Sequence, residues 1–117
     1  MVFSGSVGSF LGDTSLYARV GESVRIFFGV GGPNLDSSFH IVGESFDRVW
    51  QEGAQEFVSN VQTTLVPPGG ATMVEVKLDV PGAYMIEDHH IARLEKGAWA
   101  HVIVDAPEQP EIFAAVR

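Results

Sequence analysis

The most regular pattern along the chain is an alternation of apolar and polar positions with a period of two residues. Residues 72–80 carry aliphatic side chains at positions 74, 76, 78 and 80 and charged ones at 75, 77 and 79, and residues 23–30 have an apolar side chain at each even position. Successive side chains of a strand point to opposite faces, so each segment predicts a strand with one buried face. Six further segments predict shorter strands: residues 15–20, 37–42, 46–50, 62–66, 83–87 and 99–104.

Strong turn formers separate these segments. Gly-Gly-Pro-Asn occupies residues 31–34, Pro-Pro-Gly-Gly residues 67–70 and Pro-Gly residues 81–82. Only residues 88–96 have helical spacing, with Gly97 where a helix would end, and residues 53–60 are predicted to form a loop. Seven or eight short strands without crossover helices predict an all-β fold, a Greek-key β-sandwich with one short helix near residues 89–96.

Length and composition fit a single domain. A chain of 117 residues with 45% hydrophobic content can bury one core but is short for two. We place the domain at residues 1–105. Residues 106–117 are acidic, contain two prolines and end in an apolar group. They are predicted to be a C-terminal arm that packs on a neighbouring subunit or frays.

The charge and the absence of Cys exclude several function classes. A net charge of -8, with only seven Lys and Arg, argues against binding nucleic acid or an anionic membrane through a basic patch. An acidic face could still dock a basic electron-transfer protein. A chain with zero Cys cannot form disulfides, thiolate zinc sites or a blue-copper centre, which requires a Cys ligand. Neither an export signal nor an apolar span of about 18 residues is visible.

In a chain without Cys, the four histidines are the candidates for metal binding and proton transfer. His40 lies in an apolar strand segment, where it is either a hydrogen-bonded structural residue or part of a site. His89 and His90 lie at the junction of a strand and the short helix, a position that suits ligands. His101 lies in the last predicted strand, and this placement is typical of a histidine at a sheet surface or a subunit contact.

Six strings, in this order and spacing, resemble the second, C-terminal domain of copper-containing nitrite reductases. They are VGESVRI at residues 20–26, GVGGPN at 29–34, SSFHIVGE at 37–44, NVQTTLVPPGGA at 60–71, DVPGAY at 79–84 and DHHIAR at 88–93. The resemblance runs from Phe3 to about residue 105, and the tail is similar to the arm that ends many members. It implies a cupredoxin-like sandwich.

The resemblance also implies an activity and an assembly. Members of that family are homotrimers that reduce nitrite to nitric oxide in denitrification, and each subunit has two cupredoxin domains. The first domain holds a type 1 copper and two histidines of a type 2 copper. The second domain of an adjacent subunit completes the type 2 site. A periplasmic location and an electron-donor protein are implied as well.

By position, His89 is similar to the third ligand of the type 2 copper, with His90 as the alternative ligand. His40 is similar to the histidine that relays a proton to bound nitrite. Three further residues are implied to act beside His40: Val42, which limits how nitrite sits, and Gln62 and Thr63, which lie near His40 and support it. These assignments require His40 and His89 to face one pocket at the surface of the sandwich.

The chain carries only part of such a copper site, because the first domain, the type 1 copper and two type 2 ligands are absent from it. Three hypotheses follow. The chain is a catalytic domain that is inactive alone, or a standalone trimeric copper-binding cupredoxin-like protein, or a metal-free assembly module. The sequence leaves open whether the chain is a natural single-domain protein or an excised domain.

Overall fold

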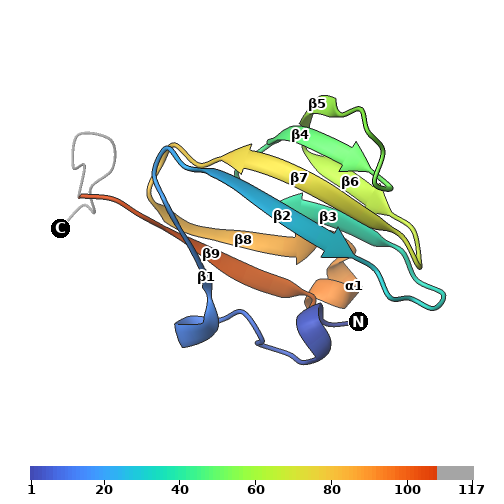
Figure 1. Cartoon of the computed structure of the whole chain (residues 1–117). Coiled ribbons are helices and arrows are strands. Elements are labelled where there is room, and N and C mark those ends of the chain that lie inside the picture. Colours follow the sequence, from blue (N-terminus) through green and yellow to red (C-terminus); the bar gives the residue numbers. More distant parts are fainter. Residues whose placement is uncertain (108–117) are drawn as a thin grey trace.

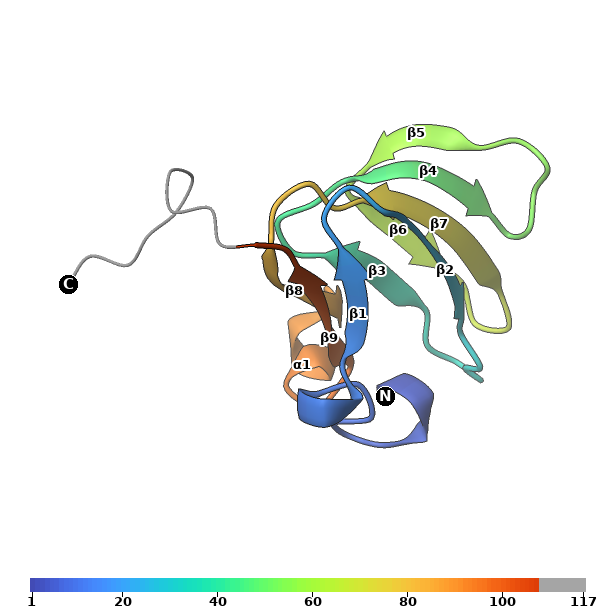
Figure 2. The same ribbon diagram turned by 60° about the vertical axis from the view of Figure 1, so that its left-hand side comes forward.

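The computed structural model describes residues 1–107, which form two β-sheets packed face to face (Figure 1). The five-stranded sheet has the order β1-β9-β8-β3-β6, and the four-stranded sheet has the order β2-β7-β4-β5. β1 runs parallel to β9, whereas the other paired strands of the described part are antiparallel. Figure 2 shows the two sheets from the side, with the short helix at one end of the larger sheet.

The strands are β1 (Leu16–Arg19), β2 (Ser23–Gly29), β3 (Ser37–Ile41), β4 (Phe46–Gln51), β5 (Val58–Val61), β6 (Thr63–Val66), β7 (Ala71–Lys77), β8 (Gly82–Asp88) and β9 (Trp99–Asp105). The helix α1 spans Ile91–Leu94, and two 3-10 turns, η1 (Phe3–Gly5) and η2 (Gly12–Thr14), precede β1. Each of the eight predicted strands is present. The β-sandwich with one short helix is therefore confirmed.

Three local predictions need correction. The loop predicted for residues 53–60 is wrong at its end, because Val58–Val61 form β5 at the edge of the smaller sheet. An edge strand pairs on one side only, and β5 is largely exposed, so it lacks a clear apolar face. β7 ends at Lys77, which leaves Val80 exposed rather than in the core. The helix is shorter than predicted and has a single turn, because β8 continues through Asp88. The backbone N–H of Asp88 donates to the carbonyl oxygen of Ala98, just before β9.

The core lies between the inner faces of the two sheets. The aliphatic residues of β7, Val74 and Val76, are almost wholly buried, as the alternation predicted. Phe39 of β3 stacks between Phe28 and Phe46, with ring centroids 4.1 and 5.4 Å away. Such stacking joins the two sheets, because Phe28 and Phe46 come from the smaller sheet and Phe39 from the larger one.

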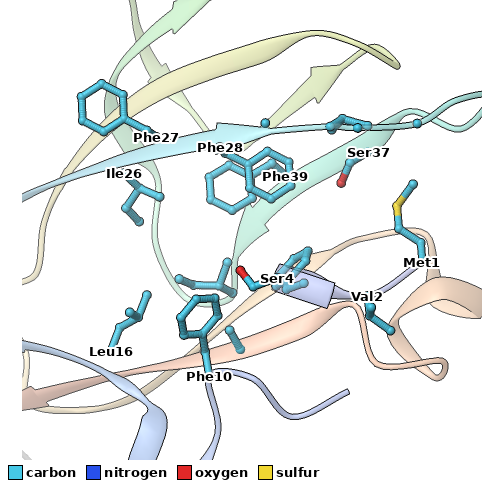
Figure 3. Close-up of a pocket in the computed structure, with 17 residues that line it drawn as sticks. Met1, Val2, Ser4, Phe10, Leu16, Ile26, Phe27, Phe28, Ser37 and Phe39 are labelled. Carbon is cyan, nitrogen blue, oxygen red and sulfur yellow. The ribbon is translucent and has the colours of Figure 1, made fainter. Parts of the chain in front are cut away.

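A cavity of about 510 Å³ lies where the N-terminal segment covers one end of this core. Figure 3 shows Phe28 and Phe39 stacked at its wall, with Phe10 and Leu16 across from them. No acidic, basic or histidine side chain among the described residues lines it. The hydroxyl of Ser37 faces it without a hydrogen-bond partner in the described part of the chain. This apolar space belongs to the core rather than to a reaction site.

Candidate metal centre

The candidate site lies on the outer face of the five-stranded sheet, where β3 and β8 run side by side. The neighbours of His40 in β3, Phe39 and Ile41, are buried in the core, so His40 points outward. Glu87 of β8 is paired directly with His40 on one side, and Thr63 of β6 on the other. Directly paired residues project to the same face of a sheet. Thr63, His40 and Glu87 therefore form a row across three strands.

His89 joins this row because it follows Glu87 by two residues and so projects to the same face. Its backbone N–H donates to the carbonyl oxygen of Ser38 at 2.9 Å, which fixes the chain beside β3 after β8 has ended. The His40 and His89 rings then meet edge to face, with centroids 5.2 Å apart and an interplanar angle of 74°. The two imidazoles share one surface site, as the sequence hypothesis requires.

His40, Glu87 and His89 together offer three ligand atoms that lie within 4.8 Å of one another. The Oε1 atom of Glu87 is 3.6 Å from Nε2 of His89. Glu87 is 4% exposed, whereas about half of the His89 side chain is accessible. The cluster thus combines a buried carboxylate with an imidazole that a second molecule can reach.

The hydrogen bonds of His40 determine which of its nitrogens is available. Nδ1 lies 2.7 Å from the carbonyl oxygen of Gln62 and 3.1 Å from Oγ1 of Thr63. A carbonyl oxygen can only accept, so Nδ1 carries the hydrogen. In the neutral ring, Nε2 therefore has the free lone pair. A histidine held by a backbone carbonyl in this way is typical of metal ligands and of proton donors.

Asp88 fixes the backbone between the two outward side chains. It is fully buried, and its Oδ1 accepts hydrogen bonds from the backbone N–H groups of Ser38 (3.2 Å) and His90 (3.1 Å). Its Oδ2 lies 3.2 Å from Nη1 of Arg93, which also bonds Asp36. Burial lowers the pKa of Arg93, but the bonds to Asp88 and Asp36 outweigh it, so that the pKa lies above its usual value.

The remaining predicted residues lie around the cluster. His90 turns toward Asp36, with Nε2 and Oδ1 3.5 Å apart, and it is outside the three-residue group. Val42 follows His40 by two residues and is 46% exposed. His101 packs edge to face on Trp99 at 5.2 Å, and both are half-buried on the outer face of β9.

An acidic pocket of about 480 Å³ adjoins His40. Glu44, Asp47 and Asp79 line it, and Lys77 is its basic residue. Burial and then the charges of Asp79 and Asp47 raise the pKa of Glu44 above its usual value. The pocket therefore attracts cations to this end of the molecule and repels anions.

Glu87 is the member of the site that sequence reasoning missed. It lies in none of the six strings that carry the family resemblance. One local signal was present, because the spacing Glu87-Asp88-His89 puts the carboxylate and the imidazole on the same face of an extended chain. Its position opposite His40 depends on the pairing of β3 with β8, which no local pattern reveals.

Known proteins similar to this chain are copper proteins. The family model described as multicopper oxidase matches residues 10–108. A copper-containing nitrite reductase from Neisseria gonorrhoeae is 51% identical over 114 residues, which cover 97% of this chain and 29% of that protein. The chain thus spans less than a third of the length of that relative.

Solved structures agree with the fold. The copper nitrite reductase from Nitrosomonas europaea superposes with a TM-score of 0.83 and 32% identity, over 94% of this chain and 41% of that one. The copper-containing nitrite reductase from Thermus scotoductus gives a TM-score of 0.81 and 31% identity, over 91% and 26%. Among residues 1–107, no helix has the length and apolar character needed to cross a membrane.

Proposed function

Because the chain belongs to the multicopper oxidase family and is a cupredoxin domain of the nitrite reductase type, we propose that it supplies part of a type 2 copper site. In this proposal His89 is a copper ligand and His40 delivers a proton to nitrite. A second polypeptide completes the site. The observation that carries the proposal is the meeting of His40 and His89 on the outer face of the larger sheet.

The donor atoms of the cluster suit copper. Imidazole nitrogen is a preferred ligand of copper at neutral pH, and a carboxylate oxygen is compatible with it. His89 is accessible, as a ligand must be if another chain is to contribute to the same site. One exposed histidine binds copper weakly, so the proposal requires the further ligands that the partner provides.

The reduction of nitrite requires protons, an electron and a defined orientation of the substrate. Conversion of nitrite to nitric oxide and water takes up two protons and one electron, and a bound copper ion supplies the electron and an open coordination position. His40 is held through Nδ1 by Gln62 and Thr63, so Nε2 is the atom that takes up and releases a proton. Val42, an exposed aliphatic residue beside it, limits the orientations of nitrite.

Several features accompany this proposal as predictions. A homotrimer would bring the sites of neighbouring subunits together, and the acidic surface would meet a basic electron-donor protein. A periplasmic location is expected from the family resemblance. His90 stays the alternative ligand, although its ring faces Asp36. The C-terminal arm predicted for residues 106–117 lies almost wholly outside the described residues.

The proposal is tested by adding the missing domain. The chain is mixed with a separately produced first domain of a copper-containing nitrite reductase, copper is added, and nitric oxide is measured. We expect no activity from the chain alone and activity from the mixture. His40→Ala should lower kcat about 10²- to 10⁴-fold with copper still bound, as loss of a proton donor does. His89→Ala should lower both copper content and activity.

The matched control is His101→Ala, which removes a half-buried histidine from the same face of the same sheet, outside the cluster. It should keep the activity of the mixture. Activity and copper content that survive His89→Ala, or that fall equally with His101→Ala, would contradict the proposal.

A further inference from the structure

Glu87 has a buried side chain that pairs with no Lys or Arg in the described part of the chain. Its side chain is 6% exposed, and within residues 1–107 no hydrogen bond to its oxygens is formed. Nε2 of His89 lies 3.6 Å from Oε1 of Glu87. This separation exceeds the 2.7–3.2 Å of ordinary N–H···O hydrogen bonds, so the contact alone does not satisfy the carboxylate. The carboxylate oxygens are therefore available to a ligand, and the ligand atom that Glu87 offers lies within 4.8 Å of those of two imidazoles.

The separation suits two ligands of one metal ion. A tetrahedral ion with bonds of about 2.0–2.2 Å holds its ligand atoms about 3.3–3.6 Å apart. Oε1 of Glu87 and Nε2 of His89 are 3.6 Å apart, and the ligand atom of His40 lies within 4.8 Å of both. About half of the His89 side chain is exposed, so the cluster can close on an ion by movement of this ring.

The support around the cluster is also that of a metal site. The N–H at Nδ1 of His40 is bound by the carbonyl of Gln62, which directs Nε2 outward as a free donor atom. Asp88 and Ser38 fix the backbone on both sides of the Glu87–His89 step. Two imidazoles and one carboxylate form a known ligand set for zinc and for other divalent first-row ions, with an open position for water or a substrate.

We propose that His40, Glu87 and His89 form a three-ligand site that binds one divalent first-row metal ion, zinc(II) or copper(II), within a single chain. This inference rests on the proposed function in treating the pocket as a metal site. It goes beyond that function in three respects: Glu87 is a ligand, His40 binds the metal through Nε2 in the isolated chain instead of carrying a proton there, and no second polypeptide is required. In an assembled site, Glu87 would add a negatively charged ligand beside His89.

The test is a calorimetric titration of the purified chain with zinc chloride, followed by the same titration of single variants. The wild-type chain should bind one zinc ion. Glu87→Gln keeps the size of the side chain, removes the charge and should weaken binding at least tenfold, and His40→Ala and His89→Ala should weaken it as well. Zinc should raise the melting temperature of the wild type and not that of Glu87→Gln. A cobalt(II) titration should give the visible bands of a four-coordinate ion with the wild type and not with Glu87→Gln.

Three matched variants serve as controls. Glu56→Gln removes an exposed carboxylate, and His101→Ala removes a histidine outside the cluster. His90→Ala tests zinc binding at the His90–Asp36 pair. All three should bind zinc like the wild type. Equal affinity of Glu87→Gln and wild type, loss of binding with His90→Ala alone, or no binding beyond that of a His40→Ala/Glu87→Gln/His89→Ala variant overturns the inference.

These outcomes are separate from those of the proposed function. A chain that binds no zinc alone but produces nitric oxide when the first domain is added retains the proposed function and loses this inference. A chain that binds zinc through Glu87 but gives no activity in the mixture retains the inference and loses the function.

Discussion

At the scale of single residues, consecutive side chains at the end of β8 lie on opposite faces of the larger sheet. Glu87 and His89 project outward, whereas Asp88 between them is fully buried. The Asp88 carboxylate accepts hydrogen bonds from the backbone N–H groups of Ser38 and His90 and from the guanidinium of Arg93. Because adjacent side chains of an extended chain point in opposite directions, the inward anchor holds its two outward neighbours in place. The buried aspartate is therefore a positioning residue for the candidate site.

Asp88→Ala is expected to destabilise the chain by about 3 kcal/mol, because two partly buried backbone N–H groups and the guanidinium of Arg93 lose their acceptor. Urea denaturation followed by circular dichroism measures this loss. Asp13→Ala, at an exposed position in η2, should change the free energy of unfolding by no more than about 0.5 kcal/mol. If the two variants lose the same stability, the anchoring role of Asp88 is wrong.

The sequence could predict the histidines of the site but not the carboxylate. His40 and His89 stand in strings that resemble a known family, and their meeting in space follows from that resemblance. Glu87 has no such motif. Its contact with the histidines arises from the register that pairs His40 with Glu87 across two strands distant in the sequence. Register is set by the packing of the whole sheet, so single-sequence patterns cannot supply it.

At the scale of elements, predictability follows burial. Each strand that alternates one buried face with one polar face was predicted, and turn formers marked the ends. β5 was missed because its residues are mostly exposed and its partner is β4 alone. The helix was overestimated because the strand β8 continues into residues whose spacing also fits a helix. Tertiary pairing decided both cases.

The turn that joins α1 to β9 depends on Gly97. Its φ is +107°, and a Cβ atom there would lie 2.7 Å from Cγ2 of Val7 in the N-terminal segment. Gly97→Ala is expected to destabilise the chain by about 2 kcal/mol, since backbone strain and a steric clash add. Thermal and urea unfolding measure the loss.

Gly53→Ala is the matched control, because Gly53 also has a positive φ, +75°, but open space around it. It should lose only about 1 kcal/mol, from strain alone. Adding Val7→Ala should restore part of the stability of Gly97→Ala and none of that of Gly53→Ala. Without that difference, the contact between the N-terminal segment and the turn contributes nothing to stability.

At the scale of the whole molecule, the net charge of -8 is not spread evenly. Glu44, Asp47 and Asp79 gather at the pocket beside His40, at the same end as the candidate metal centre. Such a field raises the local concentration of divalent cations and lowers that of nitrite. Under the proposed function, this field would favour the loading of a metal ion, and nitrite would approach from the side that a partner completes. The repulsion among these carboxylates costs stability in the folded chain.

This cost has a defined dependence on pH. Burial and the charges of Asp79 and Asp47 raise the pKa of Glu44 from 4.5 in the folded chain, so the folded state binds more protons than the unfolded state between the two pKa values. Stability therefore falls as pH rises through that window and stays lower above it. Gln cannot ionise, so Glu44→Gln should melt about 1–3 °C above the wild type at pH 7 and at the same temperature once the pH is well below 4.5. Melting curves at both pH values measure this difference, and Glu56→Gln, at an exposed position, is the control. A difference in melting temperature between Glu44→Gln and the wild type that persists at low pH would arise from packing rather than from charge.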